Sequence, residues 1–239
     1  MQLSIIIPAL NEDAKIAQDI QAAIDFISKQ NFTGEIIVVD DGSTDNTSQI
    51  AKQSVPPAGI ELKVITFKHN KGKGAAVKAG FLESKGDLVM FADAGSCVPL
   101  EDALPGFDMI NAGLCQIAHA SRRHPETVIN RAQTFFRRMT SLAFRKFAHI
   151  LIGVPRNLSD TQCGFKIYKG AVAHKLYADL KTEGFVFDIE VVLRAKKAGY
   201  SIKEFPIHWT MDPDTRISAS RNSLEILKEM FKIKKIVNK

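Results

Sequence analysis

The sequence predicts an α/β protein with a mainly parallel, buried β-sheet flanked by helices. In the first half of the chain, short β-branched runs alternate with helical patterns, as in successive βαβ units. The composition, 45% hydrophobic and 24% charged, supplies enough apolar residues for a sizeable core. A length of 239 residues is that of one large domain. We therefore expect a single domain over residues 1–239.

Four β-branched runs predict the strands of the first half, at residues 4–7, 35–39, 62–67 and 87–91. The segments between them predict helices over 13–29, 44–53 and 74–84, because each opens with capping-type residues or a glycine. Residues 115–121 predict a fifth strand. Because a helix separates each strand from the next, we expect the strands to run parallel.

The second half, from about residue 121, has a different pattern of predicted elements. It predicts a long basic helix over 130–151, a polar loop through Asp160, a short strand near 165–168 and further helices. Residues 201–209 alternate like a strand but contain Pro206, which is typical of an edge position. A parallel sheet needs covering on both faces, so we expect the halves 1–120 and 121–239 to fold together.

The cysteines and the hydropathy exclude several classes of protein. Three scattered cysteines without Cys-x-x-Cys spacing support neither a disulfide framework nor a zinc site, and we expect a reducing, cytoplasmic location. No apolar run reaches the 18 or so residues that span a bilayer, and the N-terminus lacks the pattern of a signal peptide.

The net charge of +6 is concentrated in two stretches. Residues 119–156 hold eight Arg and Lys against one Glu, and residues 221–239 hold six against two. In the helix predicted over 130–151, Arg131, Arg138 and Arg145 recur every seven residues beside an apolar face. This pattern predicts a helix lying on an anionic membrane surface, as does the basic amphipathic pattern near 221–237. A core-packing helix with a solvated basic rim is the alternative. The aromatics follow helical spacing rather than a strand platform, so nucleic-acid binding is not expected.

Acidic residues follow three of the predicted strands. Asn11 and Glu12 follow the first, Asp40 and Asp41 end the second, and Asp93 follows the fourth. In an open parallel sheet the ligand crevice lies beyond the carboxyl ends of the strands. These carboxylates are therefore expected to converge on one binding site.

Several segments carry a resemblance to a known family. Ser4-Ile-Ile-Ile-Pro-Ala-Leu-Asn-Glu12 and Ile36-Ile-Val-Val-Asp-Asp-Gly-Ser-Thr-Asp45 resemble the opening of family 2 glycosyltransferases. The resemblance continues through His69-Asn-Lys-Gly-Lys-Gly-Ala75 and Phe185-Val-Phe-Asp-Ile-Glu190. The string Ser159-Asp-Thr-Gln-Cys-Gly-Phe-Lys166 is similar to the dolichyl-phosphate glucosyltransferases and their bacterial polyprenyl-phosphate relatives. The resemblance implies the GT-A fold, with a nucleotide-sugar-binding half over 1–120 and an acceptor-side half over 121–239.

The resemblance also implies a donor site and a metal. The donor-binding residues would be Pro8, Glu12, Asp40, Asp41, Lys71 and Lys73, with backbone N–H groups of the Lys71–Gly74 turn near the diphosphate. Asp93 resembles the first carboxylate of the family's Asp-x-Asp motif, which binds Mg²⁺ or Mn²⁺. The second carboxylate is missing, because the chain reads Asp93-Ala94-Gly95-Ser96. Ser96, a backbone carbonyl or water is then left to complete the metal's shell.

The acceptor site and the catalytic residues follow from the same resemblance. Acceptor-binding residues would be Arg122, Arg131, Asp160, Gln162 and Lys166, and catalytic residues would be Asp93, Arg216, Asp188 and Glu190. For Asp188 and Glu190, direct catalysis and the orientation of loops through backbone N–H groups stay open as alternatives. Cys163 lies in the acceptor loop without a motif that would make it a nucleophile, so we expect it to pack.

The expected activity is the inverting transfer of a hexose, glucose from UDP-glucose, onto a polyprenyl phosphate of the dolichyl or undecaprenyl type. The enzyme would act as a peripheral protein on the cytoplasmic face of a membrane. Use of GDP-mannose or another nucleotide sugar is the first alternative, and a degenerate nucleotide-sugar-binding protein without turnover is the second. The sequence leaves the base, the sugar, the prenyl chain length and the oligomeric state open.

Overall fold

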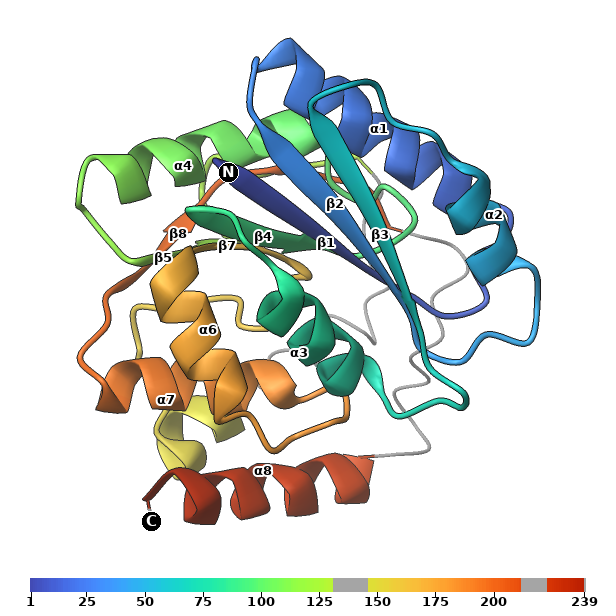
Figure 1. The fold of residues 1–239 in the computed structure, drawn as a ribbon. Helices are drawn as coiled ribbons and strands as arrows, with labels where there is room; N and C mark the ends of the chain where they lie inside the picture. The colour runs from blue at the N-terminus through green and yellow to red at the C-terminus, as the bar shows by residue number, and fades with distance from the viewer. Residues whose placement is uncertain (131–145, 212–222, 239) are drawn as a thin grey trace.

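A central sheet covered by helices on both faces organises the computed structural model, which describes residues 1–130, 146–211 and 223–238 (Figure 1). Its strands, in chain order, are β1 (Leu3–Ala9), β2 (Gly34–Asp40), β3 (Ile60–Thr66), β4 (Leu88–Ala92), β5 (Ile117–Ala120), β7 (Phe165–Lys169) and β8 (Ile202–Phe205). They lie in the order β3–β2–β1–β4–β7–β5–β8. A separate parallel pair joins β6 (Val128–Ile129) to β9 (His208–Trp209).

The direction of the strands confirms the predicted fold class. β7 runs antiparallel to its neighbours β4 and β5, and the other neighbouring pairs of the seven-stranded sheet are parallel. β8 lies at the edge of the sheet, as the proline at its end predicted. The insertion of β7 against the direction of the other strands was not predicted, because no local pattern marks it.

Helices from both halves of the chain cover the two faces of the sheet. α1 (Ile16–Lys29), α2 (Thr47–Gln53) and α4 (Leu104–Asn111) lie on one face, with the short helix η1 (Leu100–Ala103). α3 (Lys73–Glu83), α6 (Gly170–Ala178) and α7 (Phe187–Lys197) lie on the other. The side chains of β1 alternate accordingly: Ile5 and Ile7 enter the first core, and Ile6 enters the second.

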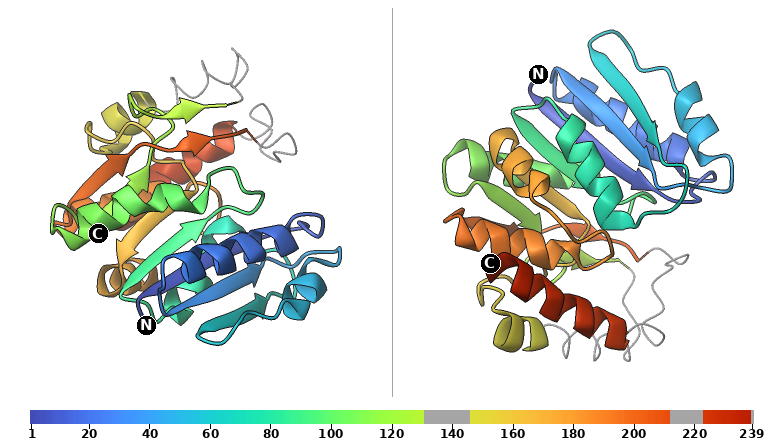
Figure 2. Two further views of the ribbon diagram at one scale, coloured as in Figure 1. Left: turned by 90° about the horizontal axis from the view of Figure 1, so that it is seen from above. Right: turned by 60° about the horizontal axis from the view of Figure 1, so that its bottom comes forward.

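An outer layer lies beyond α7. α8 (Ser223–Asn238) packs on α7 and beside the π-helical turn η2 (Ala148–Ile152), as Figure 2 shows from below. Met230, Ile233 and Val237 are the buried residues through which α8 joins the second core. The basic helix predicted over 130–151 lies mostly outside the described residues, whereas the basic helical pattern near 221–237 corresponds to α8 over its described part.

Candidate active site

The polar residues predicted to converge do lie along one edge of the sheet. Ala9 of β1 pairs with Asp40 at the end of β2, and Asp93 follows the end of β4. Because β7 is antiparallel, its first residue, Phe165, lies opposite Ala92 at the end of β4. The loop that precedes β7 therefore meets the loops that follow the parallel strands.

Two turns on the donor side are fastened together by Asp41. Its carboxylate accepts hydrogen bonds from the backbone N–H groups of Lys71 (2.8 Å) and Gly72 (2.9 Å). Burial raises the pKa of Asp41, although these two donors oppose the shift. Gly42 has φ +75°, and a β carbon there would lie 2.4 Å from the carbonyl carbon of His69. Only glycine therefore fits between the two turns.

The glycine-rich turn itself corrects one expectation. Its backbone N–H groups at Lys71 and Gly72 bind Asp41, and those at Gly74 and Ala75 donate to the carbonyl of Glu183 (2.7 and 3.2 Å). The N–H groups of Lys71, Gly72 and Gly74 were predicted to lie near a diphosphate, whereas in the structure they hold the turn in place. The lysine side chains of the turn are left to neutralise the charge of a diphosphate. The Lys71 ammonium lies 4.4 Å from the centre of the Phe67 ring, and the Lys73 side chain reaches Asp93.

Asp93 is held between Lys73 and Gly164. The Lys73 Nζ atom lies 2.7 Å from each carboxylate oxygen of Asp93 and donates its hydrogen bond to Oδ2. Oδ1 is covered from solvent and accepts no hydrogen bond from the described residues. Burial would lower the pKa of Lys73, but the carboxylates of Asp93 and Asp188 outweigh it and raise that pKa. Lys73 is therefore a cation at neutral pH.

The side chains near Asp93 limit the kind of metal ion that it can bind. The hydroxyl of Ser96 donates to Asp19 Oδ1 (2.6 Å) and the N–H of Gly95 to Asp19 Oδ2 (2.9 Å), so Ser96 is turned toward α1. Burial raises the pKa of this Asp19 carboxyl. In the part of the chain that the structure describes, no group of three or more His, Cys, Asp or Glu side chains forms a metal site. Mg²⁺ often takes one or two protein carboxylates, with phosphates and waters completing its shell. Asp93, a single carboxylate whose oxygens both contact Lys73, fits an ion of that kind only together with such phosphates.

The loop before β7 is fixed by two carboxylates. Asp160 forms a bidentate pair with Arg122, with Nε to Oδ2 at 2.6 Å and Nη2 to Oδ1 at 2.7 Å. Burial would raise the pKa of Asp160, but the guanidinium and its hydrogen bonds bring it below its usual value. Glu204 of β8 accepts hydrogen bonds from the backbone N–H groups of Ser159 and Asp160, both at 2.7 Å.

A small polar cavity lies against this loop. Its volume is about 40 Å³, and Arg122, Arg123, His149, Thr161 and Gln162 are among the residues that line it. The Nε2 atom of Gln162 is buried and has no hydrogen-bond partner among the described residues. A cavity of this size and polarity holds a water molecule or a small polar group.

Lys166 and Asp188 form a buried ion pair beneath the loop. Lys166 is 0% exposed, and its ammonium contacts the carboxylate of Asp188 in the first turn of α7. Burial raises the pKa of Asp188 against the opposing effect of Lys166 and Lys73. Lys166 thus lies below the surface that an acceptor would touch, and its ammonium faces Asp188.

Glu190, on the same turn of α7, faces away from this group of charges. It accepts hydrogen bonds from the backbone N–H groups of Lys181 (3.1 Å) and Thr182 (2.8 Å), and from Arg194 (2.7 Å). These contacts are those expected if Glu190 orients a loop through backbone N–H groups and takes no direct part in catalysis. Asp188 and Glu190 therefore lie in one turn of α7 but contact different parts of the protein.

The remaining predicted residues divide into those at the edge and those outside the described chain. Asp40 accepts the N–H of Ser43 (2.9 Å), Pro8 lies in β1, and the N–H of Glu12 donates to Thr47 (2.7 Å). Cys163 is buried, and burial raises the pKa of its thiol to about 12, so it packs and is no nucleophile. Arg131 and Arg216 lie outside the described residues.

Four residues of the site were missed by the sequence analysis: Asp19, His119, Gly164 and Glu204. His119 is 1% exposed, neither ring nitrogen has a partner among the described residues, and burial lowers its pKa well below the usual value. It lies opposite Lys166 across β5 and β7. Only the string that contains Gly164 gave a signal, since the other three lie in segments without a motif.

A search for membrane-spanning segments adds one observation. Among the described residues, no helix combines the length and the apolar composition that crossing a bilayer requires.

Comparison with known proteins identifies the family of the chain. The model of the family described as "Glycosyl transferase family 2" matches residues 4–176. The dolichyl-phosphate beta-glucosyltransferase of Saccharomyces cerevisiae is 33% identical over 97% of this chain and 74% of its own length. The human protein of the same name is 29% identical over 98% and 75%.

Solved structures resemble the whole fold. Glucosyl-3-phosphoglycerate synthase from Mycobacterium tuberculosis, in complex with UDP, has a TM-score of 0.68 at 18% identity and covers 98% of this chain and 80% of its own. The same enzyme with Mn²⁺, UDP-glucose and phosphoglyceric acid has a TM-score of 0.67 at 20% identity, over 98% and 80%. Mannosyl-3-phosphoglycerate synthase from Rubrobacter xylanophilus has a TM-score of 0.71 at 16% identity, over 97% and 73%. The match to the family model and the yeast relative decide the classification: the chain is a glycosyltransferase of family 2.

Proposed function

We propose that this enzyme transfers glucose from UDP-glucose to a polyprenyl phosphate with inversion at the anomeric carbon. The proposal is supported by relatives named dolichyl-phosphate beta-glucosyltransferase that match nearly the whole chain. The structural observation that carries it is the meeting of three cation–carboxylate pairs at one edge of the sheet: Lys73–Asp93, Lys166–Asp188 and Arg122–Asp160. A reaction between two phosphate-bearing substrates needs cations near both phosphates, and Lys73 and Arg122 are the partly exposed cations of these pairs.

The donor would bind on the side of β1, β2 and α3. Carboxylates such as Asp40 accept hydrogen bonds from base N–H groups and ribose hydroxyls, and Lys71 and Lys73 would lie near the diphosphate. The solved relatives bound to UDP and UDP-glucose support this donor class.

The acceptor would bind against the Asp160 loop, beside the Arg122–Asp160 pair. A phosphate monoester is largely dianionic at pH 7, since its second pKa is about 6. One of its oxygens would attack the anomeric carbon directly, forming the new C–O bond while the bond from that carbon to the donor's phosphate oxygen breaks and UDP leaves with the electron pair. No proton needs to be removed from the nucleophile, so the chain's task is to align both phosphates and stabilise their charge.

A divalent cation would accompany the donor. Asp93 is the residue that would hold Mg²⁺ or Mn²⁺, and the ion would supply positive charge to the leaving diphosphate. The Mn²⁺ in the M. tuberculosis enzyme supports this cofactor class.

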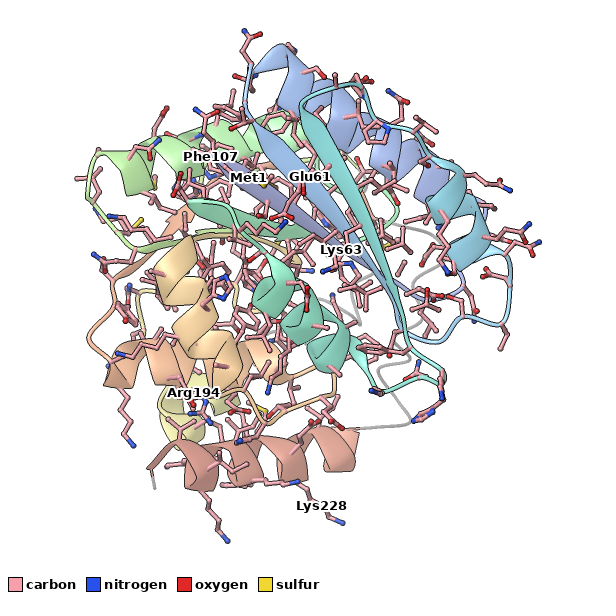
Figure 3. All side chains as sticks on the ribbon, in the orientation of Figure 1. Met1, Glu61, Lys63, Phe107, Arg194 and Lys228 are labelled. Carbon is pink, nitrogen blue, oxygen red and sulfur yellow. The ribbon has the colours of Figure 1, made fainter. Side chains whose placement is uncertain are left out.

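The acceptor's lipid tail suggests a membrane surface as the working place. The outward face of α8 carries three exposed lysines, Lys228, Lys232 and Lys235, around Phe231, which is 45% exposed. Ile150 and Leu151 of η2 are exposed beside it, and Figure 3 shows Lys228 extending outward from α8. Apolar residues ringed by lysines suit an anionic lipid surface. We assign this face, α8 with η2, to a peripheral contact with the cytoplasmic leaflet.

The test is transfer of radiolabelled sugar to a short-chain polyprenyl phosphate, with UDP-glucose and GDP-mannose as donors and with or without Mg²⁺ or Mn²⁺. We expect transfer from UDP-glucose. Asp93→Asn should lower turnover at least a hundredfold, or about 3 kcal/mol of transition-state stabilisation. Asp108→Asn makes the same charge change on the exposed face of α4 and should leave turnover unchanged. Loss of less than threefold in Asp93→Asn would contradict its role, and transfer from GDP-mannose alone would replace the donor.

A further inference from the structure

Two of the ion pairs at the site differ in how readily they can exchange partners. The Lys166 and Asp188 side chains are 1% and 5% exposed, so that pair is closed to solvent. The Lys73 and Asp93 side chains are 22% and 34% exposed, and the Lys73 ammonium lies 2.7 Å from both carboxylate oxygens of Asp93. Lys73 is therefore the cation of the two that can leave its carboxylate.

The backbones on both sides of this pair are fixed. Lys73 is the first residue of α3, and the next two N–H groups are clamped by the carbonyl of Glu183. The N–H of Asp93 donates to the carbonyl of Gly164 (2.9 Å). Any exchange of partners must therefore come from rotation of the long lysine side chain, because its stem and its partner stay in place.

We infer that the Lys73 ammonium keeps a divalent cation from binding Asp93 until a nucleoside diphosphate arrives. An ion at the Asp93 carboxylate would lie within a few ångströms of the ammonium, and the two positive charges would repel each other. A single carboxylate does not supply enough negative charge to overcome that repulsion. A diphosphate adds anionic oxygens that attract both the ion and the ammonium.

The consequence is that the ion and the nucleotide bind as one unit. Lys73 would turn from Asp93 to the diphosphate, and the Asp93 carboxylate would then be free to hold the ion together with the diphosphate. This inference rests on the proposed donor class, because it needs a diphosphate as the second ligand. It assigns to Lys73 a control over metal binding in addition to neutralisation of the donor.

Binding of Mn²⁺ to the purified chain tests the inference, with free Mn²⁺ measured by electron paramagnetic resonance in the presence and absence of UDP. We expect the unmodified chain to bind Mn²⁺ at least tenfold more tightly with UDP than without it. Lys73→Met should bind Mn²⁺ without UDP at least tenfold more tightly than the unmodified chain, and should gain less from UDP. Asp93→Asn should remove this Mn²⁺ binding in both conditions.

Two further variants separate the charge of Lys73 from its packing. Lys73→Arg keeps a cation and should still exclude Mn²⁺ in the absence of UDP. Lys85→Met removes an exposed lysine whose ammonium lies 3.4 Å from Glu61, and this variant should bind Mn²⁺ as the unmodified chain does. Equal Mn²⁺ affinity in Lys73→Met and the unmodified chain would overturn the inference, as would Mn²⁺ binding that UDP does not strengthen.

The transfer assay distinguishes this inference from the proposed function. A chain that gives the expected Mn²⁺ results but transfers no glucose would overturn the function and leave the role of Lys73 standing. Suppose instead that the unmodified chain transfers glucose and that Lys73→Met binds Mn²⁺ no more tightly than the unmodified chain. This result would overturn the role of Lys73 and leave the proposed function standing.

Discussion

Gly164 must be a glycine because of the carboxylate beside it. A β carbon at this position would lie 1.9 Å from Asp93 Oδ2, well inside van der Waals contact. The obstacle is the end of a side chain and not backbone, and the φ angle of Gly164 is not in the left-handed region. A larger residue would therefore displace the Asp93 carboxylate before it disturbed the sheet.

This contact predicts that Gly164→Ala lowers turnover far more than stability. We expect a loss of at least tenfold in kcat, because the carboxylate is moved away from Lys73, with a fall of about 1 kcal/mol in the free energy of unfolding. Kinetics and urea unfolding measure the two effects. Gly199→Ala is the matched control: Gly199 has φ +77° with open space around it, so alanine there should cost stability of about 1 kcal/mol and leave kcat unchanged. Equal kcat losses in both variants would contradict the assignment.

At the scale of elements, the Arg122–Asp160 pair joins the end of β5 to the loop before β7. Asp160 is buried and Arg122 is mostly covered, so both charges lose their contacts with water. The hydrogen bonds within the pair offset that loss. The two residues are 38 positions apart in the chain. The pair therefore fixes how the acceptor-side loop lies against the sheet.

Asp160→Asn should destabilise the protein by about 3 kcal/mol at pH 7, because it leaves a guanidinium without its charge partner. The pKa of Asp160 is lowered in the folded state, so its contribution is present above the unfolded value of about 3.9 and is lost as the pH falls through the lower folded value. The stability difference between the unmodified chain and Asp160→Asn should therefore shrink on acidification below about pH 4. Urea unfolding of both proteins across this range measures it, and a constant difference would argue against the ion pair.

The elements also show what the sequence makes predictable. The strands at 4–7, 35–39, 62–67 and 87–91 were predicted because β-branched residues mark buried strands locally, and each was found within a few residues of its predicted bounds. The carboxylates after them were placed by the general geometry of parallel sheets. The helix α4 and the direction of β7 were missed, and so was the approach of Gly164 to Asp93. The direction of β7 and the approach of Gly164 to Asp93 depend on contacts between segments about 70 residues apart, which leave no periodic signal.

At the scale of the whole molecule, α8 links the proposed membrane surface to the interior. Its buried residues join the core below α7, whereas its exposed residues form the basic outer face. Phe147, next to η2, packs edge-on against Phe231 of α8 with ring centres 5.5 Å apart. The outer layer is therefore attached to the catalytic body by packed side chains.

Replacing Lys228, Lys232 and Lys235 together with Gln should weaken binding to anionic vesicles by roughly a hundredfold, at about 1 kcal/mol for each lysine near the surface. The loss should shrink in high salt, where the charges are screened. Sedimentation with vesicles measures it. Replacing Lys52, Lys63 and Lys85 with Gln changes the same charge around α2 and the opposite edge strand, β3, and should have little effect. Equal losses in the two triple variants would show that net charge, and not this face, determines binding.

During synthesis, the ribosome releases β1 to β4 within the first 92 residues, and these four strands pair with one another. β5 follows at Ile117–Ala120, but its sheet neighbours β7 and β8 both come later in the chain. Until residues 165–169 have been made, the edges of β4 and β5 are both unpaired. Unpaired strand edges on a nascent chain are where aggregation begins. Slow elongation through residues 121–164 would therefore lengthen the time during which the edges of β4 and β5 are open to aggregation.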